Sequence, residues 1–412
     1  MGGGLGDIEE VLAAGRELAR AGHRPMLLRH GDHPLPRSVD GPWDWPPLER
    51  RARPARRAPA ALTVSPAWGV SAAPSRPEPL GKGGPWEPEC RAVERAYGSA
   101  STVHVSLEEF ARTLPTSAEN RERLREGGVP HRALPDRLAR SHRSGEADVF
   151  RVAFRRHRAF ERPNVLHLFA TFRADRAFAR EHPEAVQTGP LWPRRFDRSP
   201  RRSHRTSARE WVWYASPASA ESIAPEVVAG LAGANPPVRL YVRAGRPWTV
   251  ALRGAPVELV TGPLDPGAWG RRFASAELRI VTGSRTLLEA MELGGPFLYF
   301  NGVLGLGRRR RRHRPEKLRG WLGLARAAGV SEALRRDLAD FARGRRVRSV
   351  VRNAVRGADG WGRFPAGLRP TGFPPPYDDA GHLVVRVARA LAEAPTDAAA
   401  IVAKVRAGVT TL

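Results

Sequence analysis

The sequence predicts an α/β protein with two domains, each built on a doubly wound parallel sheet with helices on both faces. Three observations lead to this prediction. The chain has 412 residues, which is long for a single hydrophobic core. Short patterns typical of buried strands alternate with amphipathic helix patterns in both halves of the chain, as in β-α-β units. A stretch rich in proline, serine and arginine, residues 193–208, separates the two halves.

These patterns give the domain boundaries. We expect an N-terminal α/β domain at 1–192, a linker at 193–208, a C-terminal α/β domain at 209–345, and C-terminal helices at 346–412 that cross back onto the first domain. Within the first domain, residues 34–90 are rich in proline and arginine and predict an irregular segment with one strand-like run, Ala61 to Val64. Further on, Thr102 to Val105 predicts a strand and Leu107 to Leu114 a short helix.

The net charge of +26 comes almost entirely from arginine. Among 68 basic residues only Lys82, Lys317 and Lys404 are lysines. A charge of this size attracts phosphate-bearing ligands and suits nucleic acid or an anionic membrane face. However, much Arg, Ala, Gly and Pro with little Lys is also what a GC-rich coding sequence produces, and nucleic-acid tails usually interleave aromatic residues for stacking. We therefore do not expect nucleic acid as a partner, and we keep a basic nucleic-acid-binding protein as an alternative.

The single cysteine, Cys90, excludes an intramolecular disulfide and a zinc site built from cysteines. The histidines His104, His131 and His142 lack ligand spacing, so we expect no metal site. No run of 18 apolar residues is present, and no charged segment followed by an apolar run opens the chain. We expect a cytoplasmic protein, with a peripheral contact to the anionic inner face of the membrane through arginine-rich loops.

The clearest candidate site is a glycine turn that follows the strand pattern at 278–281 and leads into a short helix. Such a turn presents unpaired amides and the positive end of the helix dipole, and both attract anions. About one turn into the helix, the carboxylate of Glu289 is placed to accept hydrogen bonds from two ribose hydroxyls. The alternative is a capping box formed by Thr286 and Glu289. The candidate donor-binding residues here are Gly283, Ser284, Arg285, Thr286 and Glu289.

The turn after the first strand pattern of the C-terminal domain offers a second contact for an anion. Ser216 and Ser219 follow the strand pattern at 211–215 and precede or begin a helix. Either hydroxyl can reach a phosphate or can simply cap the helix. In a doubly wound sheet, ligands bind outside the carboxyl ends of the strands, which is where both turns fall.

A second glycine run opens the chain. Residues 2–7 read Gly-Gly-Gly-Leu-Gly-Asp, followed by an amphipathic helix that stops at Gly22 and a short strand pattern at 24–28. Glycine loop, helix and strand make half of a nucleotide-binding α/β unit. The strand that should precede the loop, the first of this domain, is missing from the pattern. We expect the true start of the protein to lie upstream.

These motifs resemble those of GT-B glycosyltransferases. The loop Gly3-Gly4-Leu5-Gly6-Asp7 and the helix end at Gly22-His23 are similar to the opening of the glycogen and starch synthases, which carry a lysine before the glycines that this chain lacks. The pairs Gly283-Ser284 and Glu289-Ala290, followed by Gly294-Gly295-Pro296, resemble the donor-binding half of GT-B enzymes. The resemblance implies two Rossmann-like domains, donor phosphates near Gly3, Gly4 and Gly6, and the nucleotide ribose on Glu289.

We therefore expect a glycosyltransferase that moves a sugar from a UDP- or ADP-linked donor to an unknown acceptor, which is a glycan, a lipid or a small molecule. The nucleotide-sugar is a co-substrate, and neither metal nor cofactor is expected. Arg285, the glycine loops and the arginine run at 308–312 are candidates to stabilise the leaving diphosphate. Asp7 is the first candidate for the base that activates the acceptor, and His33 the second. A UDP-GlcNAc-type nucleotide-sugar epimerase and a non-catalytic GT-B remnant are the alternatives.

Overall fold

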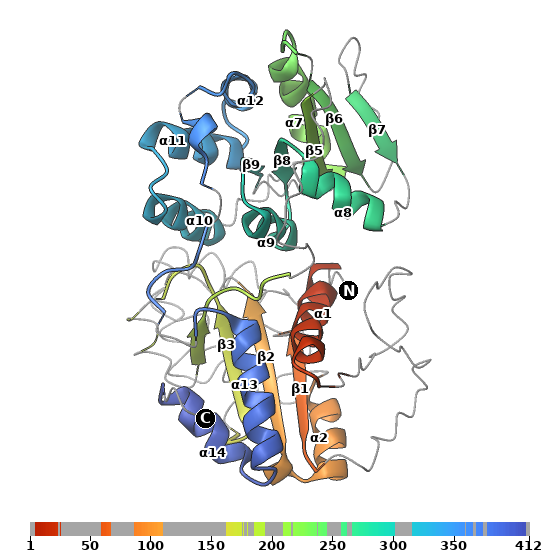
Figure 1. Ribbon diagram of the computed structural model, residues 1–412, viewed down its shortest axis with the longest axis vertical. Coiled ribbons are helices and arrows are strands. Elements are labelled where there is room, and N and C mark those ends of the chain that lie inside the picture. The colour runs from red at the N-terminus through yellow and green to blue at the C-terminus, as the bar shows by residue number, and fades with distance from the viewer. Residues whose placement is uncertain are drawn as a thin grey trace, which may run out of the picture. The chain divides into compact units, whose positions relative to one another are not determined.

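The computed structural model divides the chain into two compact units. Unit 1 contains residues 1–33, 42–191 and 372–412, and unit 2 contains residues 34–41 and 192–371. Figure 1 shows the elements of both units along the chain. The structure describes residues 5–23, 25, 59–66, 86–109, 162–174, 176, 179, 185–193, 209–215, 217–236, 238–244, 257–261, 266–300, 315–358, 360–365, 368–373 and 377–408. The predicted strand at 24–28 lies outside these residues except for Pro25.

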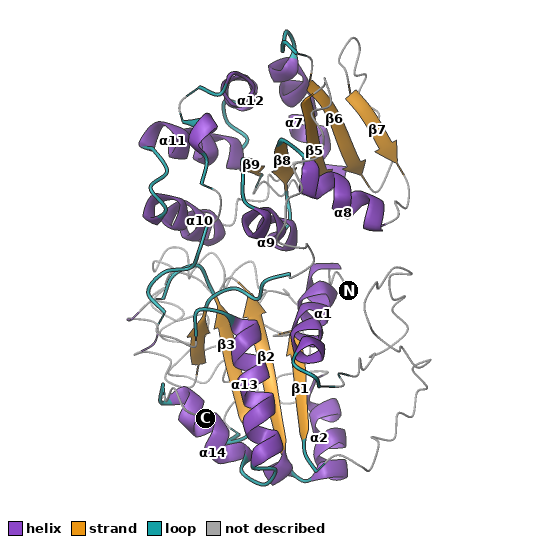
Figure 2. Ribbon diagram, viewed as in Figure 1, coloured by secondary structure: helices purple, strands orange, loops and turns teal. Residues whose placement is uncertain are grey.

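Unit 1 is built on a four-stranded sheet in which every neighbouring pair is parallel. The strands follow one another across the sheet in chain order, as Figure 2 shows. Their bounds are β1 (Ala61–Pro66), β2 (Thr102–Glu109), β3 (Val165–Ala170) and β4 (Ala185–Thr188). Side chains on both faces of β3 are buried, because a parallel sheet of this kind is covered on both sides.

Strand β2 is longer than the sequence predicted. Residues 107–109, expected to begin a short helix, continue the strand and pair with β3. The physical reason is the two-residue period, because Val103, Val105 and Leu107 alternate along the strand and all three are buried. The prediction of a helix at Leu107 was therefore wrong, and the residues after Glu109 lie outside the described part of the chain.

Helices from both ends of the chain cover the sheet of unit 1. They are α1 (Leu5–Arg20), α2 (Trp86–Tyr97), α13 (Ala380–Glu393) and α14 (Ala398–Arg406). Helix α13 packs against α1, and α14 packs against β2 and β3. Two hydrogen bonds hold this end of the chain: the Tyr377 hydroxyl donates to the Val405 carbonyl (3.0 Å), and Arg406 donates to the Val165 carbonyl (2.8 Å). The C-terminal segment from residue 372 onward is thus part of unit 1.

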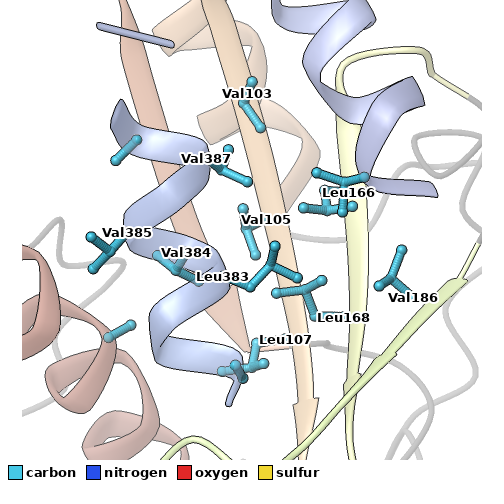
Figure 3. Close-up of a cluster of buried hydrophobic side chains, with 14 of the residues drawn as sticks. Val103, Val105, Leu107, Leu166, Leu168, Val186, Leu383, Val384, Val385 and Val387 are labelled. Atoms are coloured by element: carbon cyan, nitrogen blue, oxygen red, sulfur yellow. The ribbon is translucent and has the colours of Figure 1, made fainter. Parts of the chain in front are cut away.

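The core of unit 1 lies between the sheet and α13. Figure 3 shows the valines and leucines of β2 and β3 facing those of the helix. The fully buried members include Val105, Leu166, Leu168, Leu383 and Val384. Burial of such side chains contributes roughly 1.5–3 kcal/mol each, so the C-terminal helices account for a large share of this unit's stability.

Two helices of unit 1 differ from the predicted pattern. Helix α1 begins at Leu5, so Gly6 and Asp7 lie in its first turn and not in a preceding loop. Leu5, Ile8 and Leu12 are spaced by three and four residues and extend the apolar stripe one turn upstream. Helix α2 begins at Trp86, inside the segment expected to be irregular. Its apolar face is short, and partly buried Val93 and Tyr97 are its main members.

Unit 2 is built on a five-stranded parallel sheet with the order β7-β6-β5-β8-β9. The first strand lies in the middle, the next two run out to one edge, and the last two run out to the other. This is the doubly wound order of Rossmann-like folds. The bounds are β5 (Arg209–Ala215), β6 (Val238–Ala244), β7 (Val257–Thr261), β8 (Leu278–Val281) and β9 (Phe297–Tyr299). The two parallel sheets confirm the predicted class of two Rossmann-like α/β units.

The helices of unit 2 follow the strands closely. They are α7 (Pro217–Leu231), α8 (Pro266–Ser275), α9 (Ser284–Leu293), α10 (Pro315–Ala327), α11 (Glu332–Ala342) and α12 (Val347–Arg356). Helix α12 packs closely on α7, since a β-carbon added at Gly230 would lie 2.6 Å from the β-carbon of Val351. Within the described part of the chain, no helix is both long and apolar enough to cross a bilayer.

Candidate functional site

The candidate site lies where the strand order of unit 2 reverses. Strands β5 and β8 are neighbours, and the chain leaves them in opposite directions across the sheet, to β6 on one side and to β9 on the other. Helix α7 begins two residues after β5, and α9 begins three residues after β8. Two helix N-termini therefore start beside each other at the carboxyl edge of the sheet. In doubly wound folds this switch point is where ligands bind.

A side-chain hydrogen bond joins the two strand ends at this point. The Thr282 hydroxyl donates to the Tyr214 carbonyl over 3.0 Å, so the first residue after β8 is fixed to the end of β5. Strand pairing alone stops short of this position, because the register of β5 with β8 covers only residues 211–213. Thr282 thereby extends the junction by one residue toward the glycine turn and fixes where α9 starts.

The start of α9 has the geometry of an anion site. Gly283 is the N-cap residue, with extended backbone angles (φ −99°, ψ 160°), and its carbonyl accepts the first helical bond from the Leu287 amide at 3.0 Å. The Gly283 amide donates to the Thr286 hydroxyl over 3.2 Å. The amides of residues 284–286 precede the first helical bond and therefore have no carbonyl within the helix to donate to. Thr286 caps Gly283, so the predicted capping partnership of Thr286 with Glu289 does not form the start of this helix.

Helix α9 itself carries two charged side chains that are buried. Arg285 and Glu289 are 7% and 5% exposed, although neither type of residue is often buried. They are four residues apart and so lie on one side of the helix. Both have interaction partners within the chain. The remaining turns bury Leu287, Leu288 and Met291 in the core. The helix thus carries a buried arginine in its first turn and a buried carboxylate one turn further along.

The opposite end of α9 is fixed by an arginine that sequence reasoning missed. Arg279 of β8 is 4% exposed and binds three backbone carbonyls, at Phe273 (2.6 Å), Ala274 (2.8 Å) and Gly294 (2.9 Å). These carbonyls lie at the C-terminal ends of α8 and α9, where a cation is favoured by the helix dipole. Burial lowers the pKa of the Arg279 guanidinium to about 10, so it stays charged at neutral pH. A charged residue inside the apolar run Leu278 to Val281 was the signal available in the sequence.

Only some of the other predicted site residues lie in the described part of the chain. Ser216 lies outside the described residues, and α7 begins directly after it at Pro217, the first-turn position that suits proline. Ser219 lies in the first turn of α7, and its side chain is outside the described part. In unit 1, Gly6 and Asp7 are in α1, while Gly3, Gly4 and His33 are outside the described residues, as are Arg308 to Arg312. The described residues therefore bring together only the part of the site formed by β5, β8, α7 and α9.

Unit 1 contains a buried polar cluster that the sequence did not reveal. The Glu94 carboxylate of α2 accepts hydrogen bonds from Asn164 (2.7 Å), from His104 (3.1 Å) and from Arg162. The other ring nitrogen of His104, Nδ1, lies 2.7 Å from the Thr63 hydroxyl. A neutral ring satisfies both contacts when Nε2–H donates to Glu94 and the hydroxyl donates to Nδ1. The cluster joins α2 to the amino-terminal ends of β2 and β3, away from the edge where Rossmann-like sheets bind ligands.

The cluster holds Glu94 and His104 in different charge states. Burial alone would raise the pKa of Glu94, but the hydrogen bonds from Arg162 and Asn164, the charge of Arg162 and the bond from His104 together lower it. Burial lowers the pKa of His104, and the neighbouring Glu94 only partly offsets this effect. The folded unit therefore holds an ionised Glu94 beside a neutral His104.

We expect this cluster to make unit 1 less stable in acid. Both folded pKa values lie below the unfolded ones, so the unfolded chain binds more protons, and the unfolding free energy falls as the pH falls. The His104 part is lost below the unfolded histidine pKa of about 6.5, and the Glu94 part below about 4.3. Urea unfolding from pH 7.5 to 4, followed by hydrogen exchange of peptides from β2, measures the loss. His104→Gln should flatten the dependence between pH 6.5 and 5, and an unchanged slope there would contradict the assignment.

The sequence and the structure were compared with those of known proteins. No known family profile matches the sequence, and no curated protein matches it. The solved structures that are similar to the chain include two glycosyltransferases. The calicheamicin glycosyltransferase CalG4 is 14% identical, with 77% of this chain and 70% of that chain covered and a TM-score of 0.35. A mutant of the O-GlcNAc transferase of Thermobaculum terrenum is 15% identical, with 84% of this chain and 70% of that chain covered and a TM-score of 0.31.

Both of these similar proteins are glycosyltransferases, the class that the sequence motifs resemble. Their TM-scores are below 0.5, so the assignment of the fold rests on the strand order of the two sheets and not on these likenesses.

Proposed function

We propose that the chain is a glycosyltransferase that binds a nucleotide-sugar donor at the carboxyl edge of β5 and β8. The observation that supports this most is the pair of helix N-termini at the switch point, joined by the bond from Thr282 to Tyr214. Amides and dipoles that converge in this way favour a diphosphate. Glu289, one turn further along α9, is the proposed partner of the ribose hydroxyls. The donor is UDP- or ADP-linked in this proposal, and the acceptor is a glycan, a lipid or a small molecule.

Transfer of the sugar leaves negative charge on the departing diphosphate. Fixed amide donors at the start of α9 stabilise this charge without rearrangement, which is the effective form of electrostatic catalysis. Arg285 adds a cation at the same turn, and Gly3, Gly4 and Gly6 are the proposed contacts from unit 1. The acceptor hydroxyl needs a base, for which we propose Asp7 or, as the second candidate, His33. The proposal includes neither a metal nor a cofactor besides the donor.

We expect Glu289→Gln to weaken the binding of the preferred nucleoside diphosphate about tenfold, the loss of a charge-assisted hydrogen-bond pair. A thermal-shift screen of UDP, ADP, GDP, CDP and dTDP first identifies that nucleotide, and calorimetry then gives the affinities. Glutamine keeps the size of a buried side chain, so the variant should fold. Glu292→Gln, a carboxylate in the last turn of the same helix, is the matched control and should leave the affinity unchanged.

A modified ligand separates direct contact from an effect on the fold. If Glu289 binds the ribose, the wild type prefers the nucleotide over its 2′-deoxy form, and Glu289→Gln binds both equally. If the variant weakens both and keeps the preference, Glu289 supports the helix only and the donor assignment fails. Incubation of the protein with nucleotide-sugars but no acceptor tests the reaction class, because conversion of one sugar into another would show an epimerase instead.

A further inference from the structure

A basic pocket lies in unit 2 between the start of α12 and the middle of α7. Its volume is about 720 Å³, and its charged lining consists of Arg346, Arg348 and Arg352 with one carboxylate, Glu226. Figure 1 shows α12 beside α7, whose close packing at Gly230 brings the two helices together. None of the lining residues belongs to the site at the ends of β5 and β8. The pocket therefore has its own residues and does not overlap that site.

Two of the three arginines form no ion pair within the described part of the chain. Arg346 donates to the Asp340 carboxylate over 3.3 Å. Arg348 and Arg352 form no ion pair with any residue that the structure describes. They are four residues apart on α12 and lie on one side of it, an arrangement in which like charges repel. Their guanidinium groups therefore give the pocket wall a positive charge that the single carboxylate of the lining, Glu226, does not balance.

The backbone adds to this charge. The first helical bond of α12 runs from the Val350 amide to the Arg346 carbonyl over 2.9 Å, so the amides of residues 347–349 have no acceptor within the helix. No side chain caps this end, and its first turn contains no acidic residue. Positive side chains at the positive end of a helix dipole are unfavourable by themselves. A bound anion would relieve this repulsion.

The helix cannot turn its arginines away from the pocket. Its other side, which contains Val350, Val351 and Ala354, is buried. A side chain added at Gly230 of α7 would meet the β-carbon of Val351 and the Arg348 carbonyl. Packing on α7 thus fixes the rotation of α12, and the position of Arg348 and Arg352 follows from it. The cationic wall is a consequence of the fold and not of flexible surface side chains alone.

We infer that this pocket binds a compact ligand that carries at least two phosphate groups, held by Arg348 and Arg352. The planar guanidinium group binds two phosphate oxygens at once. Four residues of helix separate the two arginines by about 6 Å, which suits neighbouring phosphates of one ligand. No aromatic side chain is among the lining residues, so the described wall lacks the stacking surface that single-stranded nucleic acids use. A soluble polyphosphate and the headgroup of an anionic lipid share the required chemistry.

Glu226 allows a variant that should strengthen anion binding, next to the arginine variants that should weaken it. It is exposed on α7 and lines the same pocket, so its carboxylate opposes an anion there. Calorimetric titration of the full chain with inorganic tripolyphosphate measures binding without a nucleoside. We expect Arg348→Ala/Arg352→Ala to weaken binding at least tenfold, and Glu226→Gln to strengthen it a few-fold. Arg326→Ala/Arg336→Ala removes the same charge from exposed positions of α10 and α11 and should change little.

Two results would overturn the inference, and a third experiment identifies the kind of ligand. Equal weakening by both double variants would show attraction to the net charge alone and would overturn the inference. Binding of RNA with no binding of tripolyphosphate at millimolar concentration would also overturn it. Flotation with vesicles that contain a phosphatidylinositol bisphosphate, with phosphatidylcholine vesicles as reference, identifies the source. Loss of flotation in Arg348→Ala/Arg352→Ala supports a lipid headgroup. Tripolyphosphate binding without flotation supports a soluble ligand. Arg348 and Arg352 are not part of the proposed donor site, so Arg348→Ala/Arg352→Ala should keep the preference for the ribonucleotide over its 2′-deoxy form. This inference and the proposed donor site therefore fail independently.

Discussion

Replacement of Arg279 by alanine is expected to lower the unfolding free energy of unit 2 by about 4 kcal/mol. The guanidinium group satisfies three buried carbonyls at the ends of α8 and α9, and truncation leaves all of them without this donor. A cavity beside Phe273 adds to the loss, since the Arg279 guanidinium lies 5.6 Å from the centre of that ring. Urea unfolding with hydrogen exchange of peptides from β8 and α9 measures the effect in this unit.

The controls for this prediction separate geometry from charge. Arg279→Lys keeps the cation but cannot place donors on three carbonyls at once, so most of the stability should still be lost. Arg271→Ala removes the same charge from an exposed position on α8 and should have little effect. If Arg279→Ala and Arg271→Ala unfold at the same urea concentration, Arg279 does not hold these helix ends together.

Replacement of Glu94 by alanine is expected to lower the unfolding free energy of unit 1 by about 3 kcal/mol. The carboxylate accepts hydrogen bonds from Arg162, Asn164 and His104. Its removal leaves the buried Nε2–H of His104 without this acceptor and breaks the ion pair with Arg162, while Asn164 keeps its bond to the Thr102 carbonyl. The side chain of His104 is fully buried, so water cannot replace the lost partner there. Urea unfolding monitored by hydrogen exchange of peptides from α2 and β3 reports the change.

A conservative variant tests the role of charge in this cluster. Glu94→Gln retains one acceptor but loses the pairing with Arg162, so an intermediate loss is expected. Arg95→Ala changes an exposed neighbour on α2 and should have little effect. A glutamine variant no more stable than the alanine variant would show that the retained acceptor and the retained volume contribute nothing, contrary to the expected intermediate loss.

The fold of unit 2 could be predicted from the sequence because its signals are local. Gly283 and the glycines at 294–295 mark the two ends of α9, and the apolar run of Leu278 to Val281 marks the strand before it. Alternation of such segments fixes a parallel sheet, since each helix must return the chain to the same edge. The errors were also local: Leu107 fits a helical period as well as the period of two in β2, and the short apolar face of α2 gave no clear pattern.

The candidate site could be predicted only where it is continuous in the chain. The turn at Gly283 and the position of Glu289 follow from one stretch of sequence. Arg279 and Glu94 could not be assigned in this way, because their partners are backbone carbonyls in one case and residues about 70 positions away in the other. A charged residue in an apolar strand indicates burial but not its partners. The surroundings of Arg348 and Arg352 could not be predicted either, because in the sequence these residues are only two arginines of a basic helix.

The contacts of Arg279 have a consequence for ligand binding. Arg279 holds the last turn of α9 while Thr282 fixes the residue before its first turn. The helix is therefore oriented before any ligand arrives, and its amides need no ordering when an anion binds. Pre-organisation of this kind raises affinity by removing an entropic cost and not by adding a contact. For the proposed donor site, a change at Arg279 should thus weaken nucleotide binding chiefly through entropy, although this side chain touches the far end of the helix.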